Sequence, residues 1–374
     1  MKVLIAPDKF KDSLTSEEVC AAIAKGVHKS FPKAEIITQP LADGGEGTLE
    51  AIEKSLSLES RTIEVHDPLF HKIKAPYMYK GDMAFIEMSK ASGLQLLNKE
   101  DRNCMYTTSL GTGELIKDAL QHGAKNIYLF IGGSATNDAG IGIASALGYR
   151  FLDAHGNTLK PTGENLIKID RIDNSKAILT PDVEFVVLCD VSNPMHGPNG
   201  AAYVYGAQKG ASQSEIRSLD DGLKNYAHVI QQAFNMEVSN ISGAGAAGGI
   251  AASMIPLFLS KLQRGIDAII DIVKFEALLK EADFVITGEG KLDHQSLEGK
   301  VVDGVSGLCL KFSKSLGVLV GKIDLEEKQI KQLRAHQVMS VMDEAKDVKD
   351  AMNNASQHLE SLSSKLIKSI YSSL

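Results

Sequence analysis

The N-terminal part of the chain alternates short apolar runs with amphipathic stretches. Val3–Ile5 is apolar and too short for a helix, which predicts a strand that ends at Ala6–Pro7. A helix with one buried face follows and ends near Pro32. Its capping-box pair and its apolar positions are Thr15 and Glu18, and Val19, Ile23 and Val27. A second strand at 34–41 and a glycine-rich turn at 43–48 then lead into another helix, and this alternation predicts βαβ units with a mainly parallel sheet.

The pattern changes at about Arg61. Residues 61–89 form consecutive apolar and polar runs separated by tight turns, with no helix pattern between them. Such a run predicts antiparallel or mixed strand pairing and the start of a second domain. A helix near 114–121 and strands at 127–131 and 184–189 continue this domain.

The alternation of strands and helices returns after the glycine-rich stretch 243–249. The predicted elements are a helix with apolar positions over 266–277, a strand at 284–286, a helix over 297–312 and a strand at 316–320. The chain then ends in one long helix with apolar positions from Val348 to Ile370. Docking of this helix onto its own domain is the simpler interpretation, and a dimer seam is the alternative.

These patterns predict an α/β protein of two domains. Residues 1–60 plus 260–374 are expected to form one doubly wound domain with a parallel sheet. Residues 61–259 are expected to form an inserted α/β domain with a mixed sheet.

Composition fits a globular protein of ordinary kind. The 374 residues are 44% hydrophobic and 23% charged, with a formal net charge of −7 and no obvious basic block, which argues against binding to nucleic acid or an anionic membrane. A small anion needs only local positive charge and backbone N–H groups, so it stays a possible ligand. No apolar stretch approaches the ~20 residues that span a bilayer, and the first residues lack the features of a signal peptide, so we expect a cytoplasmic protein. The cysteines are widely spaced and predict free thiols rather than a zinc site or disulfides; they are Cys20, Cys104, Cys189 and Cys309.

Glycines concentrate in turns that follow apolar strands, where ligands of open α/β sheets bind. The segment 131–138 (IGGSATND) is the best candidate for a phosphate loop, because an apolar strand leads into it and a small-residue helix at 144–147 follows. The chain contains no Walker A motif and no protein-kinase signature. Residues 243–248 match G-x-G-x-x-G without a convincing strand before them, which leaves a nicotinamide site as a weaker alternative. Tight turns that any α/β chain requires are the structural alternative for each of these loops.

Several acidic residues are also placed at strand ends. Asp8 and Asp190 each follow a predicted strand, and Glu289 and Asp293 flank Lys291 after another. Such carboxylates suit Mg²⁺ or the acceptance of a hydroxyl proton, while a helix cap or turn is the structural alternative. Lys9 and Lys11 share a loop with Asp8 and either neutralise phosphate or belong to a solvated turn. The ten histidines lack metal-ligand spacing, so no transition-metal site is expected.

Several segments match one protein family in order along the chain. They are IAPDKFKDSL at 5–14, PLADGGEGT at 40–48, TTSLGTGELI at 107–116, IGGSATNDAG at 131–140, CDVSNP at 189–194, GPNGAAYVYGAQKGA at 197–211, GAGAAGG at 243–249 and ITGEGKLDHQSLEGK at 286–300. These segments resemble the bacterial glycerate kinase family, of the glycerate 2-kinase type. The resemblance implies ATP-dependent phosphorylation of glycerate with Mg²⁺. It also implies a flavodoxin-like domain into which a mixed-sheet domain is inserted.

With that resemblance, we expect the active site in the cleft between the two domains. The ATP phosphates are placed against the glycine loop, whose expected residues are Gly132, Gly133, Ser134, Thr136 and Asn137. The expected catalytic residues are Asp8, Lys11, Asp190 and Asp293, with Asp190 or Asp293 holding Mg²⁺ and Lys11 neutralising charge or binding the glycerate carboxylate. Asp8 or Asp43 would orient the attacking hydroxyl, and these acids could exchange roles. The expected substrate-binding residues are Asp43, Gly44, Gly45, Gly288 and Glu289.

The chain departs from the family pattern at a few positions. Lys9 stands where the family more often has Ser, and Asp12 and Ala139 stand where Gly is usual. Gly321–Ile323 replaces a small apolar residue and Gly.

The favoured product is 2-phosphoglycerate rather than 3-phosphoglycerate, formed from D-glycerate by a monomer or homodimer. The alternatives are an NAD(P)-dependent dehydrogenase of a small hydroxy acid and a catalytically inactive ligand-binding relative.

Overall fold

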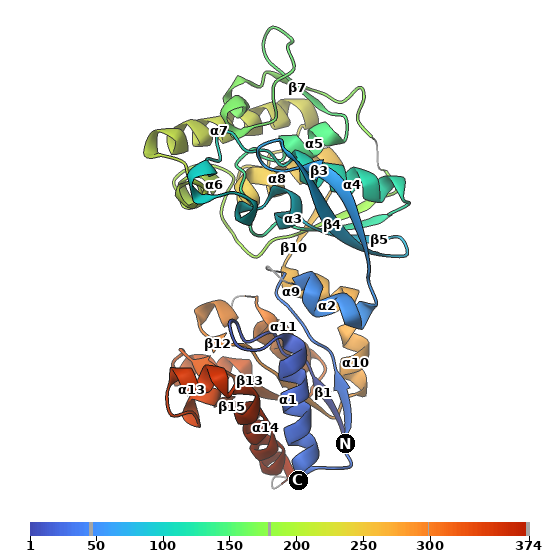
Figure 1. The fold of residues 1–374 in the computed structure, drawn as a ribbon, viewed down its shortest axis with the longest axis vertical. Coiled ribbons are helices and arrows are strands. Elements are labelled where there is room, and N and C mark those ends of the chain that lie inside the picture. The colour runs from blue at the N-terminus through green and yellow to red at the C-terminus, as the bar shows by residue number, and fades with distance from the viewer. Residues whose placement is uncertain (45–47, 179–180, 298, 372–374) are drawn as a thin grey trace. The chain divides into compact units, whose positions relative to one another are not determined.

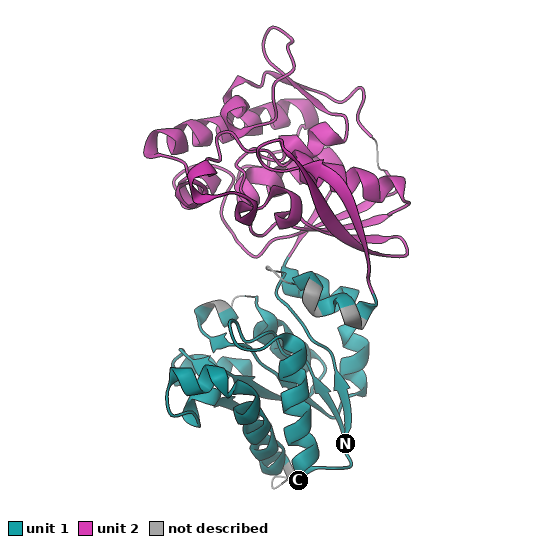
Figure 2. Ribbon diagram, in the orientation of Figure 1, with its two compact units in different colours: residues 1–57, 264–374 teal, residues 58–263 magenta. Residues whose placement is uncertain are grey.

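The chain folds into two compact units. The computed structural model describes residues 1–44, 48–178, 181–297 and 299–371. Unit 1 comprises residues 1–57 and 264–374, and unit 2 comprises residues 58–263 (Figure 2). Each unit has its own sheet and its own hydrophobic core.

Unit 1 is built on a five-stranded sheet of order β15-β13-β11-β1-β2, in which all neighbours are parallel. In chain order this is the 2-1-3-4-5 arrangement of flavodoxin-like doubly wound folds. The strands are β1 (Lys2–Ile5), β2 (Glu35–Thr38), β11 (Phe284–Thr287), β13 (Ser315–Val320) and β15 (Gln337–Ser340), with a small parallel ladder of β12 (Lys291–Leu292) and β14 (Lys322–Ile323). The helices are α1 (Ser16–Ser30), α2 (Thr48–Leu56), α9 (Gly265–Ile272), α10 (Phe275–Glu281), α11 (Val301–Lys311), α12 (Glu327–Ile330), α13 (Val348–Asn353) and α14 (Ala355–Tyr371), with short 3-10 turns η5 (His294–Leu297), η6 (Lys331–Leu333) and η7 (Val341–Asp343).

The first helix follows the sequence prediction closely. Thr15 and Glu18 form the capping box, in which each side chain accepts from the other residue's backbone N–H. The predicted apolar face is fully buried and packs with α14, which lies beside α1 in Figure 1; its members are Val19, Ile23 and Val27.

Two predicted helices of unit 1 are each broken in two. The apolar positions over 266–277 belong to α9 and α10, because Lys274 takes a left-handed backbone (φ 54°) that ends one helix and begins the next. The predicted C-terminal helix is likewise divided at Asn354 into α13 and α14. The prediction of one continuous helix was therefore wrong at both places.

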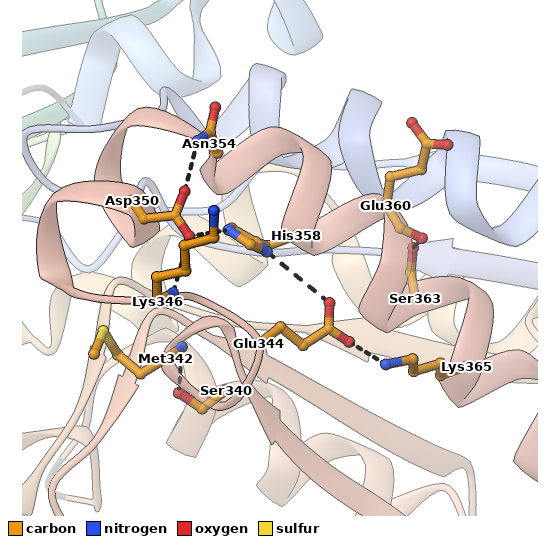
Figure 3. Close-up of polar contacts among 10 residues, drawn as sticks. All are labelled: Ser340, Met342, Glu344, Lys346, Asp350, Asn354, His358, Glu360, Ser363 and Lys365. Atoms are coloured by element: carbon orange, nitrogen blue, oxygen red, sulfur yellow. Dashed lines mark hydrogen bonds and ion pairs between the residues drawn. The ribbon is translucent and has the colours of Figure 1, made fainter.

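The C-terminal helix pair is joined by a polar cluster around His358 (Figure 3). His358 Nε2 lies 3.4 Å from an Asp350 carboxylate oxygen, and Nδ1 lies 4.0 Å from Glu344. Glu344 also pairs with Lys365 at 2.6 Å. On α13 the predicted apolar residues Val348 and Met352 are exposed, whereas those of α14 are buried against the unit, except for Ile370, which is partly buried. Docking onto its own domain is therefore confirmed for α14, and α13 is attached through polar contacts and the buried Ala351.

Unit 2 contains a six-stranded mixed sheet of order β10-β9-β6-β5-β4-β3. The pairs β3–β4 and β4–β5 are antiparallel, and β5–β6, β6–β9 and β9–β10 are parallel. The strands are β3 (Glu59–His66), β4 (Lys72–Lys80), β5 (Met83–Glu87), β6 (Asn126–Phe130), β9 (Glu184–Leu188) and β10 (Lys261–Gln263), with an outer hairpin of β7 (Arg150–Leu152) and β8 (Arg171–Asp173). The helices are α3 (Ser89–Ser92), α4 (Leu110–Gln121), α5 (Ile141–Ala146), α6 (Ala201–Tyr205), α7 (Gln213–Phe234) and α8 (Ala246–Phe258), with 3-10 turns η1 (Leu94–Leu96), η2 (Lys99–Asp101), η3 (Gly163–Lys168) and η4 (Ala207–Lys209).

The long helix α7 was not predicted. It begins at a capping box between Ser212 and Glu215 and buries an apolar face that includes Leu219, Leu223 and Tyr226. Tyr226 packs edge-on against Phe151 in the core of unit 2. Across the described residues, no helix combines the length and apolar character that crossing a membrane requires.

Candidate active site

In unit 1, three acidic loops lie at the carboxyl edge of the parallel sheet. Asp8 follows β1, Asp43 follows β2 and Glu289 follows β11. The N–H of Asp8 donates to the carbonyl of Gly288 at 2.8 Å, and the N–H of Leu41 donates to the carbonyl of Pro7 at 3.0 Å, so the loops are tied together. The boundary between β1 and β11 is the topological switch point of this strand order, the place where doubly wound sheets bind ligands.

Asp8 is partly buried beside a second carboxylate. Burial and the charge of Asp43 together raise the pKa of Asp8 to about 7. A 2.7 Å hydrogen bond from the N–H of Lys9 and the charges of Lys9 and Lys300 oppose that rise. A carboxyl group in this state exchanges its proton near neutral pH, which suits proton transfer with a hydroxyl group.

Glu289 is the second perturbed carboxyl group of this edge. Its side chain is 5% exposed, and burial raises its pKa to about 7, while Ser296 and Lys300 oppose the rise. The charges of Asp8 and Asp293 add to the rise. Within the described part of the chain, no hydrogen-bond partner reaches the Oε1 atom of Glu289. A buried polar atom without a partner costs free energy, and together with the raised pKa this makes Glu289 a candidate functional group.

Asp293 lies in the loop after β12. The Ser296 hydroxyl accepts from the N–H of Asp293 at 2.9 Å, and Lys291 Nζ lies 3.3 Å from the Asp293 carboxylate and 2.8 Å from that of Asp324. The segment Gly321–Ile323, which departs from the family pattern, has a structural role. Its residues Lys322–Ile323 form β14, which pairs with β12 beside Asp293.

The glycines of this edge are needed for close packing. A Cβ on Gly288 would meet the carbonyl of Leu319, and Gly265 at the start of α9 packs against the backbone of Asp43 and Gly44. Lys11 lies in the loop after β1 with an exposed side chain, and its backbone packs near Gly290.

The structure therefore gathers most of the predicted residues of unit 1 at one edge: Asp8, Asp43, Gly44, Gly288, Glu289 and Asp293. Gly45, also predicted, lies outside the described residues.

In unit 2, the glycine loop and Asp190 share the carboxyl edge of the mixed sheet. Phe130, at the end of β6, pairs in register with Leu188, at the end of β9. The loop 131–138 follows β6, and Asp190 follows β9. Because these strands are parallel neighbours, the two segments begin next to each other at this edge of the sheet. Asp190 is exposed.

The glycine loop is held by backbone and hydroxyl contacts on its inner side. The carbonyl of Gly133 accepts from the N–H of Leu94 at 2.9 Å, and the N–H of Ala135 donates to the carbonyl of Ser92 at 2.9 Å. Thr107, from another of the family-like segments, donates its hydroxyl to the carbonyl of Ala135 at 2.9 Å. Gly132 and Gly133 are exposed, whereas residues 134–138 are buried.

The predicted phosphate-binding helix end is filled by the protein itself. The carboxylate of Asp138 accepts from the Ser109 N–H and hydroxyl, both at 2.8 Å, and from the N–H groups of Gly140 at 3.1 Å and Gly142 at 3.3 Å. The Ser109 hydroxyl in turn accepts from the N–H of Ile143. The first N–H groups of α5 are thus already paired, so an anion at this loop would meet the exposed segment 132–133 rather than the helix end.

Sequence reasoning missed Lys209 as a site residue. Its side chain is 4% exposed, and Nζ donates to the Ser134 hydroxyl at 2.7 Å and to the carbonyl of Thr136 at 2.8 Å. Burial lowers its pKa to about 8. The available signal was the family-like segment 197–211, in which Lys209 is the one cation.

Two buried polar side chains of the loop lack partners in the part of the chain that the structure describes. They are the Thr136 hydroxyl and both amide atoms of Asn137. They lie in the same loop as the exposed glycines, separated from Gly133 by Ser134 and Ala135, and both are predicted to bind nucleotide.

The G-x-G-x-x-G segment packs against the site loops. A Cβ on Gly243 would meet the Cys189 sulfur, one on Gly245 would meet the carbonyl of Pro194, and one on Gly248 would meet Thr136 and Asn137. These glycines therefore support the loops 131–138 and 189–194 by close contact. Within the described part of the chain no strand leads into them, so the arrangement lacks the context of a dinucleotide fingerprint.

The carboxylates of Asp190 and Asp293 suit a Mg²⁺ ion that is bound together with a nucleotide. Among the described residues, no three His, Cys, Asp or Glu side chains gather in a metal-binding cluster. Magnesium in phosphoryl-transfer enzymes is held by one or two carboxylates together with phosphate oxygens, so single strand-end acids such as Asp190 and Asp293 fit this ion without an all-protein cage.

Comparison with known proteins identifies the family. The sequence model of the glycerate kinase family matches residues 3–371. The chain belongs to the glycerate kinase family. Members of a kinase family are phosphotransferases, and a kinase implies ATP as the phosphoryl donor.

Relatives of the family cover nearly the whole chain. It is 41% identical over 360 residues to the protein named glycerate 2-kinase of Escherichia coli K12, covering 95% of this chain and 94% of that one. It is 44% identical over 323 residues to the protein named glycerate kinase of Halalkalibacterium halodurans, covering 85% and 83%. A crystal structure of a protein assigned as glycerate kinase 2 from Salmonella typhimurium LT2 matches with a TM-score of 0.87 at 38% identity, covering 100% of this chain and 99% of that one. The predicted glycerate kinase family, α/β fold class and enzyme class are confirmed.

Proposed function

We propose that this chain transfers the γ-phosphoryl group of ATP to D-glycerate, with 2-phosphoglycerate rather than 3-phosphoglycerate as the product. Membership of the glycerate kinase family supports the substrate, and the relative named glycerate 2-kinase supports the position of transfer. We further propose a cytoplasmic enzyme that acts as a monomer or homodimer.

The observation that carries the chemistry is the pair of perturbed carboxyl groups at the switch point of unit 1. Asp8 and Glu289 follow neighbouring strands, and burial raises the pKa of each to about 7. A carboxylate with this pKa can accept the proton of an attacking hydroxyl at neutral pH. We assign that task to Asp8, with Asp43 next to it as the alternative.

Recognition of glycerate is assigned to the same edge. Gly44, Gly288 and Glu289 would contact the substrate, as would the predicted Gly45. Lys11 would bind the glycerate carboxylate or neutralise charge on the transferred group. Lys300 already acts on both Asp8 and Glu289 through its charge, so we add it to the cations of this site.

The nucleotide is assigned to the glycine loop of unit 2. Gly132 and Gly133 are exposed and allow close approach of phosphate oxygens, while Ser134, Thr136 and Asn137 supply hydroxyl and amide groups. Asp190, beside this loop, and Asp293, in unit 1, are the proposed Mg²⁺ ligands. When bound, Mg²⁺ would neutralise charge on the phosphate oxygens. We propose that both sets of residues serve one reaction, at the interdomain site that the sequence predicts.

One assay set tests this function against its alternatives. Coupled ADP release is measured with D-glycerate, L-glycerate and no acceptor, and NAD(P)H absorbance is followed with small hydroxy acids. ADP release that depends on D-glycerate supports the kinase, and NMR of the product distinguishes phosphorylation at the 2-hydroxyl from that at the 3-hydroxyl. Thermal stabilisation by ATP and Mg²⁺ without turnover would instead indicate an inactive binding relative.

A further inference from the structure

We propose that Lys209 is a positioning residue of the nucleotide loop, which it holds in shape from the inner side while placing a fixed positive charge behind the exposed glycines. The inference rests on the proposed binding of nucleotide by residues 132–137. It gives a role in the reaction to a residue outside the predicted site.

The surroundings of Lys209 fix its side chain. It ends η4, and its carbonyl accepts from the N–H of Cys104 at 3.1 Å. The next residue, Gly210, has φ 88°, and a Cβ there would meet the carbonyl of Arg102. The backbone is therefore wedged against the segment 102–104, and the side chain points under the glycine loop.

The partners of the ammonium group are both oxygens of that loop. Lys209 Nζ donates to the Ser134 hydroxyl and to the carbonyl of Thr136. Lysine is almost never buried without pairing, since removal of its charge from water is strongly unfavourable. Here the ammonium group donates hydrogen bonds to two uncharged loop oxygens. Such contacts fix the position of the loop more than they stabilise the core.

The hydrogen bonds to the loop carbonyl oxygens also set the direction in which the loop N–H groups point. In a trans peptide the C=O and N–H bonds point to opposite sides, and no cis bond is present among the described residues. The carbonyl of Thr136 faces Lys209, and that of Gly133 faces the N–H of Leu94. The N–H groups of Ser134 and Asn137 consequently point away from these contacts, as a loop that receives an anion requires.

The charge of Lys209 depends on its surroundings. Burial lowers its pKa to about 8, against the opposing effects of Cys104 and Asp138. The other charged group acting here is Glu215, which raises the pKa of Cys104. Asp138 is itself bound by Ser109 and by the start of α5, so it does not form a close ion pair that would cancel the ammonium charge. We therefore expect Lys209 to be charged at pH 7 and to lose its charge as the pH rises through about 8.

The test compares Lys209→Met with Lys209→Arg in steady-state kinetics. Loss of two charge-assisted hydrogen bonds should raise the KM for ATP about tenfold or more in Lys209→Met, with the KM for D-glycerate within about twofold of wild type. Lys209→Arg keeps the charge and should recover most of the ATP affinity. Near-UV circular dichroism confirms that each variant keeps its tertiary structure.

The pH dependence of the wild-type enzyme supplies a second measurement. Its KM for ATP should rise between pH 7 and pH 9, whereas that of Lys209→Arg should stay flat, because arginine keeps its charge over this range. An unchanged KM for ATP in a folded Lys209→Met, or a wild-type KM for ATP that is flat across pH 8, would overturn the proposal. Absence of glycerate-dependent turnover in the wild type would count against the proposed function instead, and the thermal shift of wild type and Lys209→Met with ATP would then decide the role of Lys209.

Discussion

The backbone N–H of Asp8 donates to the carbonyl of Gly288 at 2.8 Å, and this bond joins the loop after β1 to the loop after β11. The two loops carry the carboxyl groups of Asp8 and Glu289, and the charge of Asp8 adds to the raised pKa of Glu289. This electrostatic effect requires that both loops keep their positions. The contact of Gly288 with Leu319 serves the same purpose.

Asp8→Asn should remove the proposed base. We expect the turnover rate to fall by about 10²–10⁴-fold, with ATP binding preserved, because the glycine loop belongs to a separate unit. Steady-state kinetics and ATP-induced thermal shift measure the two effects. A variant with wild-type turnover would remove Asp8 from the reaction.

The pH dependence of the wild-type enzyme follows from the same group. Asp8 must be ionised to accept a proton, and its pKa is raised to about 7, so kcat/KM for glycerate should fall about tenfold per pH unit below that value. Activity measured from pH 5 to pH 8 checks this. A profile that stays flat down to pH 5 would show that no carboxyl group with a raised pKa takes part.

Asp8→Asn should also stabilise the fold above pH 7. The native state holds the Asp8 proton more tightly than the unfolded chain, so stability falls as pH rises from 3.8 to about 7 and stays low above it. Asparagine cannot ionise, and the variant should gain about 4 kcal/mol in free energy of unfolding at pH 8 and almost nothing at pH 4. Urea denaturation at the two pH values measures the difference. A variant less stable than wild type at pH 8 would contradict the raised pKa.

Asp190→Asn should lower turnover by orders of magnitude while leaving the fold intact, because Asp190 is exposed and follows a strand that stays buried. The exposed Asp182, which lies before that strand, provides the matched control as Asp182→Asn. Kinetics at several Mg²⁺ concentrations compare the two. Equal activity of both variants would exclude Asp190 from the site.

Gly248→Ala should disturb the glycine loop, because Gly248 packs against the backbone of Thr136 and Asn137. Gly248 has φ 74°, and an added Cβ would meet the Thr136 carbonyl and the Asn137 Cα, so we expect a loss of about 3 kcal/mol or more and weaker ATP binding. Gly81→Ala is the control, since Gly81 has φ 59° and no atom within 4 Å, and it should cost only about 1 kcal/mol. Chemical denaturation of both variants gives the comparison. Equal losses would show that the contact of Gly248 with the loop has no energetic weight.

Leu259→Gly should stabilise unit 2. Leu259 ends α8 with φ 53° and is 78% exposed, so glycine relieves backbone strain with little loss of packing and should add about 0.5 kcal/mol. The same change at Leu310, which is 53% exposed inside α11, should instead cost about 1 kcal/mol. Thermal unfolding separates the two signs. Destabilisation at Leu259 would contradict the assigned backbone conformation.

The sequence revealed those features that depend on local pattern. The capping box of Thr15 and Glu18, the strand at Val3–Ile5 and the acidic loop with Glu289 could all be predicted, because periodicity and turn residues encode them directly. The same signal was present at Ser212 and Glu215, where α7 was overlooked.

Other features depend on tertiary contacts that no spacing encodes. The sequence pattern places Asp138 in a phosphate loop, yet its carboxylate accepts hydrogen bonds from the N–H and hydroxyl of Ser109, which is distant in sequence. Lysine is usually a surface residue, and Lys209 is buried because the loop oxygens of Ser134 and Thr136 accept hydrogen bonds from its ammonium group. The departures Asp12 and Ala139, found where the family usually has Gly, take φ 61° and φ 48°, so the glycine-like backbone persists without glycine.

The decisive measurement is glycerate-dependent formation of ADP, followed by ³¹P NMR of the product. We expect ADP release with ATP, Mg²⁺ and D-glycerate together, and a product phosphorylated on the 2-hydroxyl. Release of ADP at the same rate without glycerate, or no release under any of these conditions, would contradict this expectation.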